Sequence, residues 1–331
     1  MPAVLTHYFC GDACVNALCA GADDAFNCVA NNRDIFNLGC QGPDILFFSF
    51  DKKLSRLGSR MHERGINGFF AECINIIRKT AEHDGRSVME SYMYGFLCHY
   101  ALDCATHPYV FYKSGFSDVS GNLGQAFNAS HRFLETTIDC IISEKFMDKK
   151  PHEQNIPKIL QAPGADMEDV SELLSKTINV AYDEDCEPED FEKSMRRMRL
   201  VYRLFRSKRG RPPVLSFIAK LLPDRGAKYA LMHYEPVRQL DYLNEQRDAW
   251  FYPWNDSVEI NFSFMDLFQK AVEDSCILIS AFRRAINRQL EDKIALSIIG
   301  NKNFSTGLEN PVDFLYYNME IKPLREVTKN A

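Results

Sequence analysis

The sequence predicts an all-α fold: a multi-helical single domain with a metal cluster buried between its helices, and a C-terminal helical extension. Apolar residues recur at helical spacing, as in Phe70, Cys73 and Ile77, whereas alternating strand patterns are scarce. Side chains of the types that bind metals also fall inside apolar segments, which is typical of a polar site within a helical bundle. With 331 residues, 46% of them hydrophobic, the chain can bury a large core.

The N-terminal part of the chain is predicted to form helices separated by loops rich in Gly and Pro. Breaks are expected at Gly39–Pro43 and Gly115–Gly124, because these residues interrupt the helical periodicity. The segment Gly95–Pro108 reads GFLCHYALDCATHP, and the segment Ser130–Cys140 reads SHRFLETTIDC. We expect both segments to be helical, and we treat residues 1–150 as one metal-binding region.

Residues 151–331 are expected to form a C-terminal helical region that packs on the first. A loop is predicted at Pro151–Gly164, and the acidic run Asp183–Lys193 is expected to be the solvated start of a helix. From Met195 to Arg211 apolar residues follow one helical stripe and arginines fill the remaining positions, which predicts a basic amphipathic helix. A further helix is expected at Phe262–Lys293.

Charge and composition exclude several classes of protein. The formal net charge of -6 argues against a nucleic-acid binder, and we expect no nucleic-acid partner. No apolar run approaches the roughly 20 residues that cross a bilayer. The 11 cysteines and the absence of a secretory signal at the start favour reduced thiols and a cytoplasmic protein. Met195–Arg211 could contact an anionic membrane peripherally, or could be a surface helix whose arginines stay in water.

His99, Asp103 and His107 follow one another at four-residue steps inside the first predicted helix. This spacing returns each side chain to nearly the same side of an α-helix. Burial of two imidazoles and a carboxylate is costly unless something pairs them, and a divalent cation does so well. The row therefore predicts a metal site.

Further candidate ligands surround this row in the sequence. His131 and Glu135 are again four residues apart, with Asp139 one turn further. Asp44 stands in the Gly/Pro turn GCQGPD, and His62 stands in SRMHERG. On local evidence Asp44 fits a helix N-cap as well as a rigidly presented ligand. The number of candidates within a short length of chain favours a shared metal centre.

These motifs resemble those of the zinc-dependent phospholipase C family, which includes secreted bacterial enzymes that hydrolyse phosphatidylcholine. The shared order is TH near the start, GPD, a single His, HYxxDxxxHP and HxxxE. The resemblance covers roughly residues 5–145 and is strongest in HYALDCATHP and HRFLE. It implies an all-α fold in which a cluster of up to three zinc ions hydrolyses a phosphodiester on the glycerol side of the phosphate.

The resemblance also implies three sets of zinc ligands. The first zinc would be held by Asp44, His62, His99 and Asp103. The second would be held by His107, His131 and Glu135. The third would share Asp103 with His7. In the secreted members the third zinc also binds an N-terminal tryptophan, which the start MPAVLTH lacks, and the corresponding Asp-to-His spacing is wider. Two zinc ions are therefore expected, and the third site departs from the pattern of the family.

The expected function is phospholipase C-type cleavage of a glycerophospholipid by zinc-activated water, with Asp44 or Glu135 as proton acceptor. Two alternatives stay open. A zinc-binding or lipid-binding protein with little or no turnover would fit the incomplete third site. An HD-type nucleotide phosphohydrolase would fit the doublet His83-Asp84, although Gly85 directly after it suggests the end of a helix.

Several aromatic residues admit two interpretations. Tyr94, Tyr100 and Tyr109 could line a choline pocket through cation–π contacts, or could pack in the core. Trp250 and Trp254 could form a wall that faces lipid, or could anchor the core. The sequence does not separate these interpretations.

Overall fold

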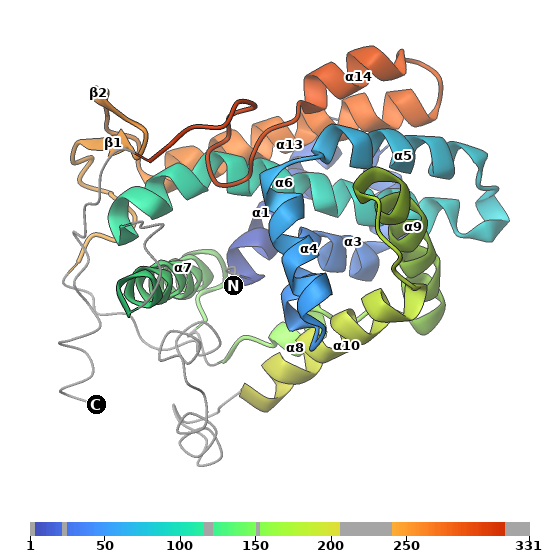
Figure 1. Ribbon diagram of the computed structural model, residues 1–331, viewed down its shortest axis with the longest axis horizontal. Helices are drawn as coiled ribbons and strands as arrows, with labels where there is room; N and C mark the ends of the chain where they lie inside the picture. Colours follow the sequence, from blue (N-terminus) through green and yellow to red (C-terminus); the bar gives the residue numbers. More distant parts are fainter. Residues whose placement is uncertain (1–3, 22–24, 116–121, 150–152, 206–239, 315–331) are drawn as a thin grey trace.

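The computed structural model describes residues 4–21, 25–115, 122–149, 153–205 and 240–314 (Figure 1). The N-terminal helices are α1 (Val4–Ala20), α2 (Ala25–Asn31), α3 (Arg33–Gly39), α4 (Lys52–Glu63), α5 (Ile66–Lys79), α6 (Arg86–Ser114) and α7 (Asn122–Met147). Two 3-10 helices lie among them, η1 (Gly42–Phe48) and η2 (Glu82–Asp84). The C-terminal elements are α8 (Ile156–Ile159), α9 (Gly164–Tyr182), α10 (Pro188–Phe205), the strands β1 (Trp250–Tyr252) and β2 (Asn255–Ile260), α13 (Phe264–Ile286) and α14 (Asp292–Ile299). The predicted all-α class is confirmed.

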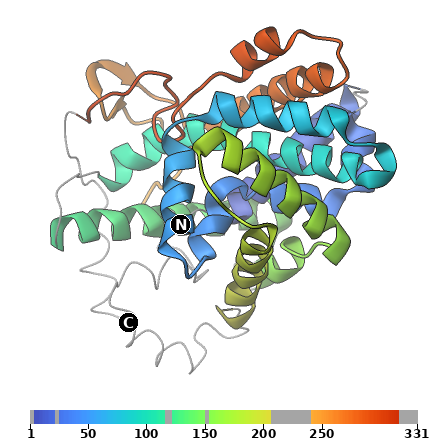
Figure 2. The ribbon, with the colours of Figure 1, turned by 45° about the vertical axis from the view of Figure 1, so that its right-hand side comes forward.

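Helix α6 lies at the centre of the packing. Helix α13 runs beside it, and α1, α3 and α7 also contact it (Figure 1). Around this centre, α9 packs on α5, while α10 packs on α9 and η1 (Figure 2). Elements from before and after residue 150 therefore share contacts. The predicted boundary between the two regions falls at residues 150–152, outside the described residues.

Local sequence explains where the helices around the centre begin and end. The Asp51 side chain accepts a hydrogen bond from the amide of Lys53 and so caps α4. Ser263 and Asp266 form a capping box, each side chain accepting from the other's backbone amide, and this begins α13. At its other end α13 stops at Ile286, because the polar turn that follows includes Arg288 at a φ of 57°. The predicted helix Phe262–Lys293 was therefore wrong at both ends.

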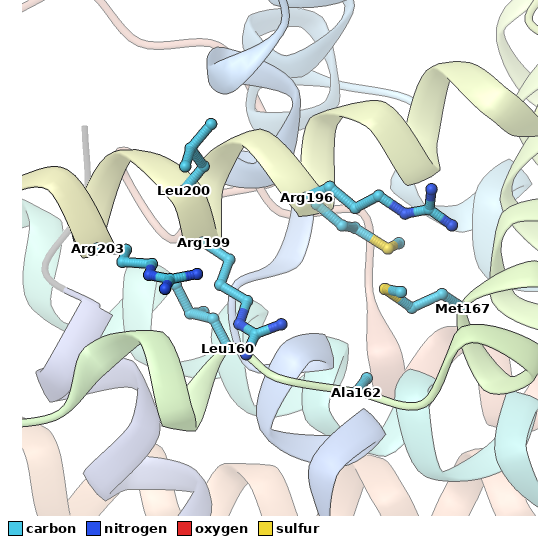
Figure 3. Close-up of a pocket in the computed structure, with 8 residues that line it drawn as sticks. Leu160, Ala162, Met167, Arg196, Arg199, Leu200 and Arg203 are labelled. Atoms are coloured by element: carbon cyan, nitrogen blue, oxygen red, sulfur yellow. The ribbon is translucent and has the colours of Figure 1, made fainter.

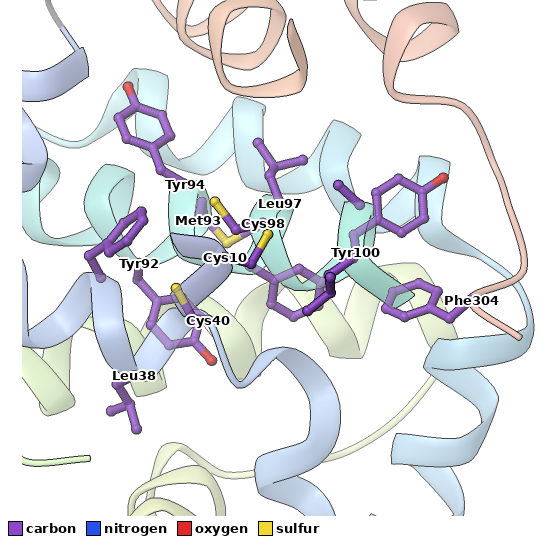
Figure 4. Close-up of a cluster of buried hydrophobic side chains, with 14 of the residues drawn as sticks. Cys10, Leu38, Cys40, Tyr92, Met93, Tyr94, Leu97, Cys98, Tyr100 and Phe304 are labelled. Atoms are coloured by element: carbon purple, nitrogen blue, oxygen red, sulfur yellow. The ribbon is translucent and has the colours of Figure 1, made fainter. Parts of the chain in front are cut away.

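The three tyrosines of the first region belong to the core. Tyr94, Tyr100 and Tyr109 are buried, and Figure 4 shows the first two within the apolar cluster. Each hydroxyl donates a hydrogen bond inside the protein, as a buried phenol requires. The acceptors are the Glu90 carboxylate and the carbonyl oxygens of Ile299 and Tyr242. These contacts favour the core interpretation over a choline pocket.

The tryptophans lie in a β-hairpin that was not predicted from the sequence. Strand β1 pairs antiparallel with β2, with Trp250 opposite Ile260. Trp250 is buried, whereas Trp254 is partly exposed and stacks on Tyr252 with the ring centroids 5.0 Å apart. Trp250 is thus a core anchor. The strands are too short to give a clear alternation of apolar and polar residues, which explains why the sequence did not predict them.

Helix α10 confirms the helical character of the basic segment from Met195 to Phe205, and residues 206–211 of that prediction lie outside the described residues. Among the helices of the described part, none combines the length and apolarity needed to cross a bilayer.

Candidate metal centre

The row of polar residues on α6 lies on one buried face, as its four-residue spacing predicted. Asp103 is the middle of the row. Its Oδ2 lies 3.1 Å from Nε2 of His99, and its Oδ1 lies 3.8 Å from Nδ1 of His107. His99 and Asp103 are almost completely buried. Helix α6 thus brings two imidazoles to one carboxylate.

Asp44 reaches this row because α3 and α6 approach closely through two glycines. A Cβ on Gly39 would lie 2.1 Å from a carbonyl oxygen of α6, and one on Gly95 would lie 2.2 Å from a carbonyl oxygen of α3. Gly42, at a φ of +51°, then turns the chain against the ring of His99. The turn brings Asp44 Oδ2 to 3.8 Å from His99 Nε2. The Gly/Pro turn and η1, which starts there, therefore present a buried carboxylate to this row.

His62 joins Asp44 from the last turn of α4. Its Nε2 lies 3.1 Å from Asp44 Oδ1 and 3.8 Å from Asp103 Oδ2. The ligand atoms of Asp44, His62 and His99 all lie within 4.8 Å of one another. We call these three residues together with Asp103 the first group.

His7 approaches the first group from α1, and Asp139 on α7 fixes the start of that helix. The Asp139 carboxylate accepts hydrogen bonds from the amides of Leu5 and Thr6, at 2.9 and 2.7 Å. A carboxylate is favourable there because first-turn amides have no partner within the helix. His7 Nε2 consequently lies 3.3 Å from Asp103 Oδ1. Asp139 is thus a positioning residue.

His107, His131 and Glu135 form a second group where α6 and α7 meet. Oε1 of Glu135 lies 3.2 Å from Nε2 of His107 and 3.0 Å from Nε2 of His131. The ligand atoms of these three residues lie within 4.8 Å of one another. The structure therefore brings all eight candidate ligands together, in two neighbouring groups with His7 beside the first.

Backbone carbonyls fix the orientation of three of the imidazoles. Nδ1 of His62, His99 and His107 lies 2.7, 3.2 and 3.1 Å from a carbonyl oxygen. The carbonyls belong to Gly58, Cys40 and Phe304. Because a carbonyl oxygen only accepts, Nδ1 must carry the proton, and the neutral ring then has its lone pair on Nε2.

These lone pairs face carboxylate oxygens. The Nε2 to oxygen distances are 3.1 Å for His62 with Asp44, 3.1 Å for His99 with Asp103 and 3.2 Å for His107 with Glu135. A lone pair and an anionic oxygen repel each other at this separation. Each contact therefore requires a proton or a metal cation that is shared by the two atoms.

Buried atoms without partners mark the place where a cation fits best. Asp44 Oδ2, His99 Nε2 and Asp103 Oδ2 have no hydrogen-bond partner within the described residues. An unsatisfied buried polar atom costs about 1–3 kcal/mol, so three together are unusual. Imidazole nitrogens and carboxylate oxygens are the donor set that suits zinc. The first group therefore fits a divalent metal.

Carboxylates and burial have opposite effects on the pKa of the histidines. Burial lowers the pKa of His107, but the neighbouring carboxylates, Asp103 foremost, override it and raise that pKa to about 9. The same competition raises the pKa of His7 and His62 above its ordinary value. At His99 burial prevails and lowers the pKa. The carboxylates thus favour the protonated imidazole at His107, His7 and His62, whereas burial opposes it at His99.

Both shared carboxylates stay ionised. Burial acts to raise the pKa of Asp103, but the neighbouring imidazoles, His107 foremost, hold it well below its ordinary value. Burial likewise acts to raise the pKa of Glu135, but His131 lowers it. Each of these two carboxylates consequently keeps the negative charge that attracts a divalent cation.

A cavity of about 20 Å³ lies between the two groups. Its polar lining includes His7, Asp103, His107 and Glu135. That volume suits an ion or a single water molecule.

Phe304 covers the centre from the C-terminal region, and the sequence reading missed it. Its ring contacts the ring of His62 with centroids 4.9 Å apart, and its carbonyl oxygen is the one that orients His107. Its amide also donates to the carbonyl of His62 at 2.8 Å. Because Phe304 lies 197 residues after His107 and carries no ligand atom, no local pattern could have revealed it.

The doublet His83-Asp84 lies apart from this centre, in η2. His83 is exposed, and the ligand groups found in the described part of the chain do not include it. A buried metal pair at this doublet, which an HD-type phosphohydrolase requires, is thus not supported.

Comparison with known proteins gives one match. The model of a family described as zinc-dependent phospholipase C matches residues 6–184, more than half of the 331 residues. The matched range includes all eight candidate ligands. No curated protein and no solved structure matches the chain.

Proposed function

The chain belongs to the zinc-dependent phospholipase C family, and from this premise we propose that it cleaves glycerophospholipids on the glycerol side of the phosphate. The products would be a diacylglycerol and a phosphorylated head group. Membership supports metal-dependent hydrolysis of phospholipids in general. The side of cleavage, the ligand sets and the role of each residue are parts of the proposal.

The geometry that supports the proposal most strongly is the opposition of imidazole Nε2 atoms and ionised carboxylates. Carbonyls hold the Nδ1 protons of His62, His99 and His107, so their lone pairs converge on oxygens at 3.1–3.2 Å. Convergent lone pairs and oxygens are what zinc ligands need.

The two groups would hold one zinc ion each. The first ion would take Asp44, His62, His99 and Asp103 as ligands, and the second would take His107, His131 and Glu135. For a third ion the described residues offer His7 and Asp103, with His99 as the remaining candidate. Because carbonyl contact occupies Nδ1 of His99, its Nε2 can serve one ion only, and the third site is therefore the weakest.

Bound zinc would neutralise the phosphodiester oxygens and lower the pKa of an attacking water from about 15.7 towards 7. Asp44 is the better placed proton acceptor for that water. Its Oδ2 has no hydrogen-bond partner within the described residues, whereas Oε1 of Glu135 already faces two imidazoles. Glu135 would then hold His107 and His131 in place. The geometry thus favours Asp44 over Glu135 as the base.

Hydrolysis assays on three substrates test the proposal. Phosphatidylcholine, a soluble aryl phosphodiester and a nucleoside triphosphate are each incubated with protein whose zinc content is known. We expect diacylglycerol from phosphatidylcholine, loss of turnover with a chelator and recovery when zinc is returned. Bound zinc without turnover of either phosphodiester would contradict the proposal in favour of a non-catalytic zinc protein. Turnover of the nucleotide alone would favour the HD-type alternative.

A further inference from the structure

Large apolar side chains are exposed on the outer face of α10 and on the loop between η1 and α4. Phe50 is 87% exposed, Leu204 is 60% exposed and Leu200 is 51% exposed. Single exposed apolar residues are common on soluble proteins, but these belong to one surface. Leu200 and Leu204 are one turn apart on α10, and Arg197, one turn before Leu200, lies over the ring of Phe50 at 4.4 Å.

The same surface is basic, although the chain as a whole is acidic. From residue 196 to residue 205 the sequence has four arginines and no Asp or Glu. Arg199 is committed to packing, since it donates to the carbonyl of Pro157. Arg203 is exposed and makes no ion pair within the described residues, and Arg197 is held against Phe50. Arg196 pairs with Glu192 at 2.7 Å, so Arg197 and Arg203 are the two arginines of α10 that could meet an external anion.

A pocket beside the exposed leucines suits an anionic group. It has a volume of about 190 Å³, and Arg196, Arg199 and Arg203 line it. Figure 3 shows these arginines leaving α10, with Met167 and Ala162 across the pocket. Arg196 is paired with Glu192 and Arg199 donates to Pro157 and Gln161, so Arg203 supplies the guanidinium that can meet a phosphate beside the apolar wall. The volume admits a phosphate group and not a whole lipid.

The inner face of α10 connects this surface to the metal centre. Tyr202 is buried on that face, and its ring contacts the ring of Phe48 with centroids 5.9 Å apart. Phe48 ends η1, the 3-10 helix that carries Asp44. Contact between α10 and a membrane would therefore be made by an element that packs directly on the centre.

We propose that Phe50, Arg197, Leu200, Arg203 and Leu204, the docking face, bind the protein to the surface of an anionic phospholipid membrane. The partner follows from charge and chemistry. A net charge of -6 would repel the protein from anionic lipid, so attachment needs a local basic surface that also inserts apolar groups. The proposal rests on the hydrolase function, which supplies the reason for contact with lipid.

Vesicle sedimentation with the full-length, zinc-loaded protein tests the docking face. One set of vesicles contains phosphatidylcholine alone, and the other contains about 30% phosphatidylserine, enough for a strongly negative surface. Diacylglycerol is measured in the same tubes, so that turnover during the experiment is known. We expect binding to anionic vesicles that falls as salt is added, and much weaker binding to neutral vesicles.

Two double variants separate charge from insertion. Arg197→Gln with Arg203→Gln should weaken binding to anionic vesicles by about 25-fold, since each arginine near the surface contributes about fivefold. Leu200→Ser with Leu204→Ser should weaken binding by at least about tenfold through lost apolar burial. Arg197 is half-buried and the other three side chains are exposed, so both variants should keep the fold, and their far-ultraviolet circular dichroism checks this.

Matched controls lie on other faces of the molecule. Lys176→Gln with Lys270→Gln also removes two positive charges, from side chains that are 61% and 63% exposed on α9 and α13. Val180→Ser with Ile277→Ser removes apolar groups that are 67% and 57% exposed. Both controls should bind vesicles as the unmodified protein does. Equal losses in controls and docking-face variants would overturn the proposal, as would equal binding to neutral and anionic vesicles.

Hydrolysis of a short-chain phosphatidylcholine dissolved as monomers separates the docking proposal from the proposed function. All four double variants should retain this activity, because none of the substituted residues belongs to the metal centre. If the unmodified protein lacks it while selective sedimentation persists, the hydrolase proposal fails and docking stands. If it is present and sedimentation shows no preference for anionic lipid, docking fails and the hydrolase proposal stands.

Discussion

The two groups of the candidate metal centre differ in how far they satisfy themselves. In the second group Glu135 faces both His107 and His131, at 3.2 and 3.0 Å, so one carboxylate pairs two imidazoles. In the first group one oxygen of Asp44, one oxygen of Asp103 and Nε2 of His99 are buried and have no hydrogen-bond partner among the described residues. The first group thus has more buried polar atoms without a hydrogen-bond partner.

This difference suggests how each group responds to a cation. Protons can occupy the contacts of the second group in the metal-free protein, and the raised pKa of His107 is consistent with this. In the first group the carboxylates raise the pKa of His62, but burial lowers the pKa of His99 and opposes its protonation. A cation is therefore the better partner for the first group, whereas the second group can exchange a cation for a proton. We expect the first group to bind zinc more tightly.

The substitution Asp103→Asn should have the largest effect, because it acts on the carboxylate nearest to both groups. The substitution removes an anionic zinc ligand next to His99. It also removes the carboxylate that balances positive charge at His7 and His107. We expect loss of bound zinc and a fall in kcat/KM on phosphatidylcholine of about a hundredfold or more, beyond the cost of losing an outer partner. Elemental analysis and hydrolysis rates measure both, with the exposed Asp248→Asn as control. Full zinc content with near-normal activity would refute the central role of Asp103.

Glu135→Gln and Asp44→Asn should next distinguish a ligand from a base. For Glu135→Gln we expect loss of zinc from the second group only and a decrease in rate of about ten- to a hundredfold. For Asp44→Asn we expect a larger loss of kcat than of zinc content, because the variant lacks the proton acceptor. Equal losses of kcat relative to zinc content in the two variants would contradict the assignment of the base to Asp44.

Gly42→Ala should affect the first group without changing a ligand. A Cβ at this position would lie 2.4 Å from Cδ2 of His99, and the backbone φ of +51° disfavours any L side chain. We expect His99 to move and the zinc affinity of the first group to fall by about tenfold, with the second group spared. Gly68→Ala on α5 is the control, because a Cβ there would meet nothing within 4 Å. An equal effect of both substitutions on zinc affinity would count against the inferred fit.

The smallest expected effect is the pH dependence of stability in the metal-free protein. The pKa of His107 is raised from 6.5 to about 9, so the stability that it contributes is complete below about pH 6.5. That contribution should be lost as the pH rises through about 9, and His107→Gln should flatten this slope. Zinc-loaded protein should show the opposite trend, because protons then compete less for the ligands. Urea unfolding midpoints across this range measure both, and a metal-free protein that gains stability towards pH 9 would disprove the prediction.

Local periodicity was sufficient for the parts of the site that lie on single helices. His99, Asp103 and His107 share a face of α6, and His131 and Glu135 share a face of α7, because helical geometry fixes those relations within one turn. The all-α class followed from the same signal. Spacing alone, however, left open which ligands belong together, and the ligand sets came from family resemblance.

Contacts between distant segments could not be foreseen in the same way. The carbonyl of Cys40 orients His99, which lies 59 residues later in the chain. The Asp139 carboxylate accepts from the amide of Leu5 at the start of α1, and these two residues are 134 positions apart. Backbone carbonyls carry no sequence signal, since every residue has one. Asp139 was noticed only as the next turn after Glu135, whereas its amide contacts depend on how α1 packs against α7. Such contacts depend on the tertiary arrangement and not on residue type.

X-ray diffraction at the zinc absorption edge, from crystals of protein purified with zinc, tests the account of the two groups most directly. Anomalous difference maps should show one peak among Asp44, His62, His99 and Asp103, and a second, weaker peak among His107, His131 and Glu135. Brief soaking in a chelator should remove the second peak first. A zinc-saturated crystal without a peak in the first group, or with zinc bound elsewhere, would contradict the account.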